Sequence, residues 1–250
     1  MSKDLPTIIV PARLSSIRFP RKLLQKIDGI PLIIHTAKRI KEIAPEFDSV
    51  FAVDGDELKS LLVNNGFRAI MTEPNLSSGT DRIFAANQRL LSSRIINIQA
   101  DEPLVSREHI LSLVKAINKD NARMATLAVP FRKQEDFVDK NQVKVVLDQF
   151  GFALFFSRLP IPEFRDNLKF DDYIKHGYKP LKHLGMYAYT KEFLEKFAQA
   201  PPGLLEKIEK LEQLRALEMG EKILVSEVES ETLGIDIPED LKKLGRLLLN

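Results

Sequence analysis

Cysteine and tryptophan are both absent from the 250-residue chain. Without cysteine, disulfide bonds and thiolate metal sites are excluded, and the lack of cysteine fits a reducing compartment. No apolar run approaches the roughly 18 residues that cross a membrane as a helix. The apolar segment at residues 7–10 is also far too short for the core of a secretory signal peptide. We therefore expect a cytoplasmic protein without a membrane-spanning segment.

A strong net charge is missing as well. The 37 lysines and arginines nearly balance the 35 aspartates and glutamates, which leaves a formal charge of +2. The net charge therefore gives no reason to expect a polyanionic partner. The chain also has no aromatic stretch of the kind that binds RNA. A nucleic-acid-binding module is thus disfavoured. The apolar fraction of 44% and charged fraction of 29% are typical of a globular protein with a sizeable core.

Strand-like and helix-like segments alternate through the first half of the chain. Short apolar runs bounded by turn residues predict strands, and apolar residues at helical spacing predict helices. Four such β–α units favour a parallel, doubly wound sheet. The expected strands are residues 7–10, 48–54, 67–72 and 94–100, and the expected helices are residues 31–45, 56–65, 80–91 and 106–119.

The second half predicts a mixed α/β arrangement, with a long surface loop at residues 160–180. No linker or repeat marks a boundary, so we expect a single α/β domain over residues 1–250. The expected strands are residues 124–130, 142–148, 152–158, 183–190 and 222–229, and the expected helices are residues 191–200, 205–220 and 238–249.

The basic loop "VPARLSSIRFPRK" follows the first expected strand, where ligands of open α/β sheets bind. It carries Arg13, Arg18, Arg21 and Lys22 and no acidic residue. Arginine and lysine donate to phosphate oxygens, although a solvated basic loop has the same composition. The chain lacks both G-x-x-x-x-G-K-[ST] and G-x-G-x-x-G, so neither a Walker A loop nor a dinucleotide-binding fingerprint is present.

Other polar motifs follow the next strands at the same expected edge. "SSGTDR" predicts a helix start capped by Ser78 or Thr80, where Gly79 permits close approach of a ligand or serves an ordinary cap. "QADEP" places Asp101 where it can hold Mg²⁺. Asp236 is a second candidate, although Glu239 three residues later also fits a helix capping box. None of the four histidines has zinc-site spacing.

Nine motifs in order resemble those of the 3-deoxy-manno-octulosonate (KDO) cytidylyltransferases. The resemblance runs from about residue 7 to the C-terminus. The motifs are VPARLSSIRFPRKLL, SSGTDRI, NIQADEP, MATLAVP, VKVVLD, FFSR, HLGMYAY, LEQLRALEMG and IDIPEDL.

The resemblance implies a Rossmann-like nucleotidyltransferase fold and a homodimer. It implies the Mg²⁺-dependent reaction of CTP with KDO to give CMP-KDO and pyrophosphate, for lipopolysaccharide precursor synthesis. It also implies a nucleotide-binding half at about residues 1–125 and a sugar-binding and dimerisation half at about residues 126–250.

Site residues carry over by position from the family pattern. Arg13 and Lys22 match the residues that bind the triphosphate, with Ser16 and Arg18 assisting. Ser78 and Arg82 match residues near the nucleotide. Asp101 and Asp236 match the Mg²⁺ ligands, and with Arg13 and Lys22 they form the expected catalytic set. The expected sugar site comprises Gln99, Arg158, His183, Tyr187 and Glu212.

The sequence also departs from the family pattern, which leaves the sugar open. The substrate can be KDO, its 8-amino derivative or another 2-keto sugar acid such as an acylneuraminate. Arg21 stands where the family has glycine, so we expect it to be the dispensable cation of the basic loop. The other departures are Leu23 for proline, Val53 for threonine, Leu76 for histidine and Ala100 for glycine.

Overall fold

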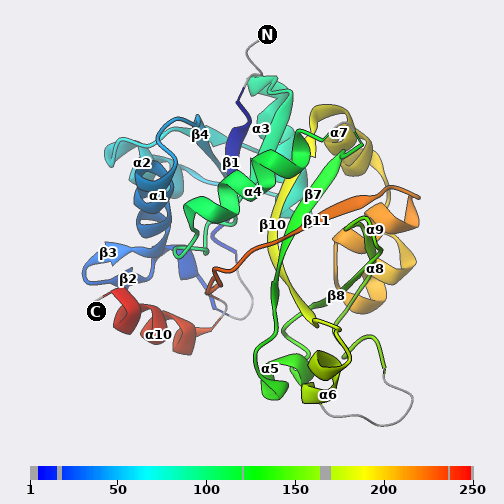
Figure 1. The fold of residues 1–250 in the computed structure, drawn as a ribbon. Helices are drawn as coiled ribbons and strands as arrows, with labels where there is room; N and C mark the ends of the chain where they lie inside the picture. The colour runs from blue at the N-terminus through cyan, green and yellow to red at the C-terminus, as the bar shows by residue number, and fades with distance from the viewer. Residues whose placement is uncertain (1–4, 16–18, 120, 164–169, 236, 249–250) are drawn as a thin grey trace.

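The computed structural model describes residues 5–15, 19–119, 121–163, 170–235 and 237–248. Nine strands of this part of the chain form one sheet, and seven of them follow the order β11-β7-β10-β6-β1-β4-β5 (Figure 1). These seven are β1 (Thr7–Ala12), β4 (Ser49–Val53), β5 (Ala69–Met71), β6 (Arg94–Asn97), β7 (Met124–Pro130), β10 (Leu181–Thr190) and β11 (Ile223–Glu227).

The first half of the sheet is parallel and the second half is mixed, as the sequence predicts. Strand β1 pairs in parallel with β4 and β6, and β4 pairs in parallel with β5. Strand β10 runs antiparallel to β6 and β7, and β11 is parallel to β7. Two further strands, β8 (Lys144–Leu147) and β9 (Ala153–Ser157), form an antiparallel branch that joins the sheet where β8 pairs with β10.

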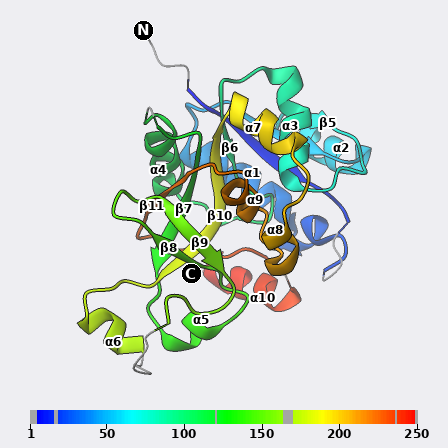
Figure 2. The ribbon, with the colours of Figure 1, turned by 90° about the vertical axis from the view of Figure 1, so that its right-hand side faces the viewer.

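Helices cover both faces of the sheet (Figures 1 and 2). Alternate residues of β1 therefore belong to different cores: Ile8 and Val10 to one, Ile9 to the other. Helices α1 (Leu32–Ile43), α2 (Asp56–Asn64) and α4 (Arg107–Ile117) pack on the first core, and α3 (Gly79–Leu90), α7 (Lys191–Gln199) and α9 (Gln213–Glu218) on the second.

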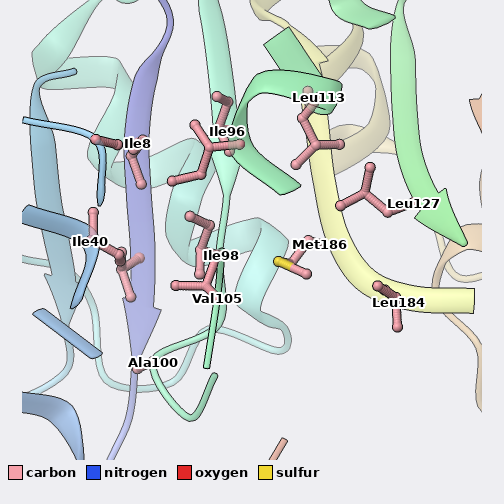
Figure 3. Close-up of a cluster of buried hydrophobic side chains, with 14 of the residues drawn as sticks. Ile8, Ile40, Ile96, Ile98, Ala100, Val105, Leu113, Leu127, Leu184 and Met186 are labelled. Atoms are coloured by element: carbon pink, nitrogen blue, oxygen red, sulfur yellow. The ribbon is translucent and has the colours of Figure 1, made fainter. Parts of the chain in front are cut away.

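Figure 3 shows part of the first core, to which three neighbouring strands contribute Ile8, Ile96 and Met186, and α4 contributes Leu113. Burial on both faces explains why the strands are continuous apolar runs rather than alternating ones. In the described part of the chain, no helix has the length and apolar character needed to cross a membrane.

The C-terminal helix α10 (Pro238–Leu248) returns to the first half of the chain and lies beside a small hairpin (Figure 1). The hairpin joins β2 (Lys26–Ile27) to β3 (Ile30–Pro31) through Asp28 and Gly29, which both have positive φ. Such a two-residue turn favours Asp-Gly. The return of α10 brings residues 231–235 back to the edge where β1, β4 and β6 end.

The expected helix at residues 205–220 is wrong, because the chain breaks there into α8 (Leu204–Glu209) and α9. Lys210 takes a left-handed conformation with φ of 54°. The Glu209 carboxylate accepts hydrogen bonds from the Ser157 hydroxyl at 2.8 Å and the Arg158 backbone N–H at 3.0 Å. These tertiary bonds hold the end of α8 against β9, which a continuous helix would not allow.

The expected surface loop at residues 160–180 also needs correction, since it contains helix α6 (Phe170–Lys175). Phe170 and Tyr173 of α6 pack on Phe137 of another short helix, α5 (Gln134–Val138), and form a small aromatic cluster. Helices of five or six residues are too short to show helical periodicity in the sequence.

The predicted capping box of Asp236 and Glu239 differs from the observed helix start. Helix α10 begins at Pro238, so its cap position is Ile237, and the Asp240 carboxylate accepts the Ile237 N–H at 3.0 Å. Asp236 lies outside the described residues.

Candidate active site

The basic loop is anchored where β1 and β4 end. Arg13 is exposed directly after β1, and the next residue, Leu14, donates its backbone N–H to both carboxylate oxygens of Asp54, at 3.3 and 3.2 Å. Because Asp54 follows β4, this contact fixes the start of the loop to the edge of the sheet. Ser16 and Arg18 lie outside the described residues.

Lys22 joins three segments that are far apart in sequence. Its Nζ donates to the Asp101 carboxylate and to the Ile235 carbonyl, the latter at 2.9 Å. The Ile235 N–H in turn donates to the Asp101 carbonyl at 3.1 Å. Two of the predicted catalytic residues therefore touch, and the segment that leads into Asp236 lies against them.

The donor set at this junction fits a hard cation. An ammonium group held by a carboxylate and a carbonyl marks an oxygen-lined position for positive charge. Among the described residues, no three His, Cys, Asp or Glu side chains converge on a common point. A site with few carboxylates suits Mg²⁺, which keeps several waters and binds substrate phosphates, better than it suits a metal held by protein ligands alone.

Glu102 lies next to this junction and was not predicted from the sequence. Burial, followed by the nearby Asp101 charge, raises its pKa to about 7. The Thr232 hydroxyl donates to its carboxylate, and a Cβ placed on Gly234 would come within 3.0 Å of Glu102 Oε1. Only the fold brings residues 102 and 232–234 together, so no local pattern could have revealed the contact.

The start of α3 sits at the same edge. Ser78 is the N-cap: its hydroxyl accepts the Asp81 N–H at 3.1 Å, while the Asp81 carboxylate accepts the Ser78 N–H at 3.1 Å. A Cβ on Gly79 would lie 3.4 Å from Pro11 and 3.6 Å from Gln99. The first turn of α3 therefore approaches the ends of β1 and β6 closely.

Arg82 is buried and bonded to the protein itself. It donates to the Thr72 hydroxyl at 2.5 Å and to the carbonyls of Glu73 and Pro74 at 3.2 and 3.4 Å. Burial lowers the pKa of its guanidinium. Arg82 therefore holds the segment after β5 in place.

Four of the five predicted sugar-site residues gather around β10. The rings of His183 and Tyr187 are 5.5 Å apart, and Tyr187 stacks on Tyr189 at 5.9 Å. Tyr187 pairs in register with Asn97 of β6, whose side-chain oxygen accepts from Gln99 Nε2 at 2.9 Å.

Glu212, the N-cap residue of α9, completes this group. The Thr80 hydroxyl donates to its Oε2 at 2.9 Å, and burial raises the pKa of the Glu212 carboxyl. Its other oxygen, Oε1, has no hydrogen bond among the described residues and lies 3.6 Å from the Arg215 guanidinium. The charge of Glu212 also contributes to the raised pKa of Tyr187, after the larger effect of burial.

Arg158 is placed differently from the other predicted sugar residues. Its guanidinium donates to the carbonyls of Glu209, Lys140 and Lys210 at 2.7, 3.1 and 3.3 Å. In the described part of the chain it has no hydrogen bond with the other four. It braces the break between α8 and α9.

Arg21 also differs from its neighbours in the basic loop. Its φ is 55°, in the left-handed region that favours glycine. Its guanidinium forms an exposed ion pair with Glu57 of α2 at 2.5 Å. The side chain is therefore directed to α2 rather than to the Lys22 and Asp101 pair.

Three of the other departures from the family pattern are core residues. Leu23, Val53 and Ala100 are 3%, 0% and 3% exposed and pack in the first core. Leu76 is half-buried just before α3. The three core departures therefore alter packing beneath the site rather than its polar surface.

A cavity of about 800 Å³ opens beside His183, between β10, α10 and the segment that enters β8. Its lining carries more acidic than basic side chains. The charged lining residues are Glu102, Asp136, Asp139, Glu231, Asp240, Lys182 and Lys243.

Comparisons with known proteins agree on one family. Residues 7–223 match the family model described as Cytidylyltransferase. Proteins named 3-deoxy-manno-octulosonate cytidylyltransferase from Nitratiruptor sp. and Wolinella succinogenes are 44% and 43% identical to this chain. The first alignment covers 95% of this chain and 98% of the relative, the second 94% and 96%.

The solved structures support the same grouping. A CMP:2-keto-3-deoxy-manno-octonic acid synthetase complexed with CTP superposes with a TM-score of 0.89 at 32% identity, covering 98% of this chain and 99% of the other. A cytidylyltransferase from Leptospira borgpetersenii shares the fold alone, with a TM-score of 0.60 at 16% identity over 96% of this chain and 84% of the other.

Proposed function

The chain belongs to the 3-deoxy-manno-octulosonate cytidylyltransferase family, and from this membership we propose that it transfers the cytidylyl group of CTP to KDO. The products are CMP-KDO and pyrophosphate. The contact of Lys22 with both Asp101 and Ile235 is the observation that carries the proposal. It joins a cation of the basic loop to the two segments that hold the candidate metal ligands.

The reaction forms one bond and breaks one. The anomeric oxygen of the sugar attacks the α-phosphorus of CTP, the bond from that phosphorus to the bridging oxygen breaks, pyrophosphate leaves, and the hydroxyl proton passes to solvent. Positioning and charge neutralisation dominate such transfers. Arg13 and Lys22, with Ser16 and Arg18, bind the triphosphate and stabilise the charge that builds on pyrophosphate.

Of the remaining predicted site residues, some act on the nucleotide and the others on the sugar. Ser78 at the start of α3 contacts the nucleotide, and Arg82 shapes its pocket by holding the carbonyls of Glu73 and Pro74. Gln99, His183, Tyr187 and Glu212 line the sugar site. Arg158 supports that site through its bonds to the α8–α9 break.

Asp101 and Asp236 would hold Mg²⁺ in this proposal. When bound, the ion neutralises phosphate charge and lowers the pKa of the attacking hydroxyl. We expect Asp101→Asn and Asp236→Asn each to lower kcat about 100-fold or more. Calorimetric titration of Mg²⁺ with CTP present should show weakened metal binding for both variants. Unchanged metal binding and turnover would remove these two residues from the metal site.

The test of the substrate is pyrophosphate release with CTP held constant. KDO, 8-amino-KDO and N-acetylneuraminate are compared as acceptors. We expect the highest kcat/KM with KDO, and a protein that used none of the three would contradict the proposal.

The 8-amino derivative is a second candidate because of the cavity beside His183. Five of its seven acidic or basic lining residues are acidic, and an acidic lining favours an ammonium group over a hydroxyl. A preference for the amino sugar in the same acceptor panel would select this candidate.

A homodimer is part of the proposal, and an exposed apolar surface on β9 and α8 supports it. Bonds from Glu209 to Ser157 and Arg158 hold α8 beside β9 (Figure 2). The exposed apolar residues of these elements, called here the β9–α8 surface, are Leu154 of β9, Leu159 two residues after β9, and Leu204 and Ile208 of α8. Exposed apolar patches of this kind mark protein interfaces. We also place the reaction in the cytoplasm, where CTP is available.

A further inference from the structure

Thr126 is a buried residue of β7 whose hydroxyl has three polar neighbours. Its Oγ1 lies 2.8 Å from the Met186 carbonyl oxygen, 3.2 Å from the Leu184 carbonyl oxygen and 2.9 Å from His183 Nε2. The side chain is fully buried, so no water replaces these partners.

An irregularity in β10 brings the two carbonyls together. The pairing of β10 with β7 shifts register between Leu184 and Tyr187, so that Leu184 faces Leu127 while Tyr187 already faces Thr126. Such a bulge bends the strand and redirects its side chains. Here both carbonyls of the irregular segment point at one hydroxyl.

The hydrogen atoms can be assigned from these three contacts. A threonine hydroxyl has a single hydrogen, and carbonyl oxygens can only accept. The hydroxyl therefore donates to one of the two carbonyls, and its lone pair accepts a hydrogen from His183 Nε2. His183 is then the Nε2–H tautomer, and its Nδ1 carries a lone pair.

The surroundings keep the imidazole neutral. Phe156 packs edge-on against it with ring centroids 5.0 Å apart, and Tyr187 lies on another side at 5.5 Å. Burial lowers the pKa of His183 to about 3. Among the described residues, the hydrogen bond of the His183 ring is the one from Nε2 to Thr126, so Nδ1 is left for a ligand, and the ring lies on the wall of the 800 Å³ cavity.

We propose that Thr126 is a positioning residue which holds His183 as the Nε2–H tautomer, so that Nδ1 accepts a hydrogen bond from a hydroxyl of the sugar acid. The inference rests on the proposed function, because it takes the cavity wall at His183 as part of the sugar site. A bare nitrogen repels a carboxylate, so His183 recognises a hydroxyl and the sugar carboxylate binds elsewhere.

Nitrogen NMR of the substrate-free protein tests the tautomer. Long-range proton–nitrogen spectra of ¹⁵N-histidine-labelled protein distinguish protonated from bare ring nitrogens, and a His183→Gln spectrum assigns the signals among the four histidines. We expect a protonated Nε2 and a bare Nδ1 at pH 7.5. A protonated Nδ1, or a doubly protonated ring, would overturn the inference whether or not the protein uses KDO.

Kinetics test the consequence for the sugar. We expect Thr126→Val to raise KM for KDO about tenfold, the loss of roughly one well-aligned hydrogen bond, while KM for CTP changes less than about twofold. Thr126→Ser keeps a hydroxyl and should restore both the KM for KDO and the tautomer. An unchanged KM for KDO in Thr126→Val would count against the positioning role.

Thr7→Val is the matched control, since it also removes a hydrogen bond of a buried hydroxyl, the one to Ser92 at 2.6 Å. Thr7 is the first residue of β1, whereas the candidate active site lies beyond the last. If Thr126→Val fails to fold, the wild-type spectrum still tests the tautomer of His183, and Thr126→Ser should still show that tautomer and the wild-type KM for KDO. Wild-type turnover with KDO tests the proposed function separately from either result.

Discussion

At the scale of single residues, the cations of the basic loop differ in their partners. Arg21 is paired with exposed Glu57 and holds a left-handed backbone, whereas Lys22 contacts Asp101 and Ile235. The family pattern has glycine at position 21, and the positive φ gives a physical reason for that preference. A residue that resembles a phosphate ligand in sequence is thus engaged elsewhere.

We expect Arg21→Gly to retain kcat within about threefold and Lys22→Ala to lose about 100-fold or more, because only Lys22 lies at the charged junction. The stability of Arg21→Gly should change little, since relief of the left-handed conformation offsets the lost surface ion pair. Steady-state pyrophosphate release and urea unfolding measure the two quantities. Equal losses of activity in the two variants would contradict this ranking.

The neutral ring of His183 also predicts a pH dependence of stability. Its pKa is about 3 in the folded protein, below the ordinary value of about 6.5. Between these values the unfolded chain binds a proton that the folded protein does not, so stability is present above pH 6.5 and is lost as the pH falls toward 3.

The wild type should therefore lose about 2 kcal/mol more than His183→Gln between pH 7.5 and pH 5. Urea unfolding at the two pH values measures the difference. The comparison cancels other groups, including His109, whose pKa burial also lowers. Identical slopes in the two proteins would show that His183 titrates normally.

At the scale of elements, Arg215 ties α9 to α7 and α8. It donates to both carboxylate oxygens of Glu206, at 2.7 and 2.6 Å, and to the carbonyls of Phe197 and Ala200. Its guanidinium lies 4.6 Å over the Phe197 ring. Since Glu212 is the N-cap residue of this short helix, the ion pair also fixes the position of Glu212, which we propose lines the sugar site.

We expect Arg215→Met to lower the free energy of unfolding by about 3–5 kcal/mol, because it leaves the mostly buried Glu206 carboxylate without its partner. Replacing both residues, with Glu206→Met added, should recover a large part of that loss. Urea unfolding of the single and double variants provides the measurement. A double variant as unstable as the single one would mean that packing, not charge, dominates at this contact.

The long elements were predictable from the sequence and the short ones were not. The apolar runs of β1, β4 and β6 and the periodic helices α1, α3 and α4 carry enough residues to establish a pattern. Helices α5 and α6 are too short for that, and the break at Lys210 depends on bonds from Glu209 to a strand about 50 residues away.

The candidate site also has residues that the sequence could place and residues that it could not. Residues that follow a predicted strand, such as Arg13 and Asp101, could be placed at one edge by the rule for open sheets. Glu102 with Thr232, and Thr126 with His183, could not, because each pair forms only after β10 and the C-terminal segment have folded onto the first half. The bulge in β10 does have a local signal, because it falls at Gly185, and an isolated glycine inside an apolar strand often marks a bulge.

At the scale of the whole molecule, helix α8, which carries part of the β9–α8 surface, lies at the right of the molecule in Figure 1, whereas α2 lies at the left. Ile208 is 69% exposed there, so a charge at this position should not disturb the fold. We expect the wild type to be a dimer and Ile208→Asp to raise the dimer dissociation constant at least about tenfold. Sedimentation velocity measures both.

Val63→Asp on α2 is the matched control, because Val63 is also an exposed apolar helix residue. It should leave the dimer unchanged. A monomeric wild type, or equal dissociation of both variants, would contradict the assignment of this surface.

The position of β10 also matters while the chain is being made. Strand β10 pairs with β6, β7 and β8, yet it is synthesised roughly 80 residues after β6, several seconds later on a translating ribosome. Until then the inner edges of β6 and β7 have no partner and can pair with another nascent chain. Yield in a cell therefore depends on how quickly residues 181–190 emerge and on whether a chaperone covers those two edges first.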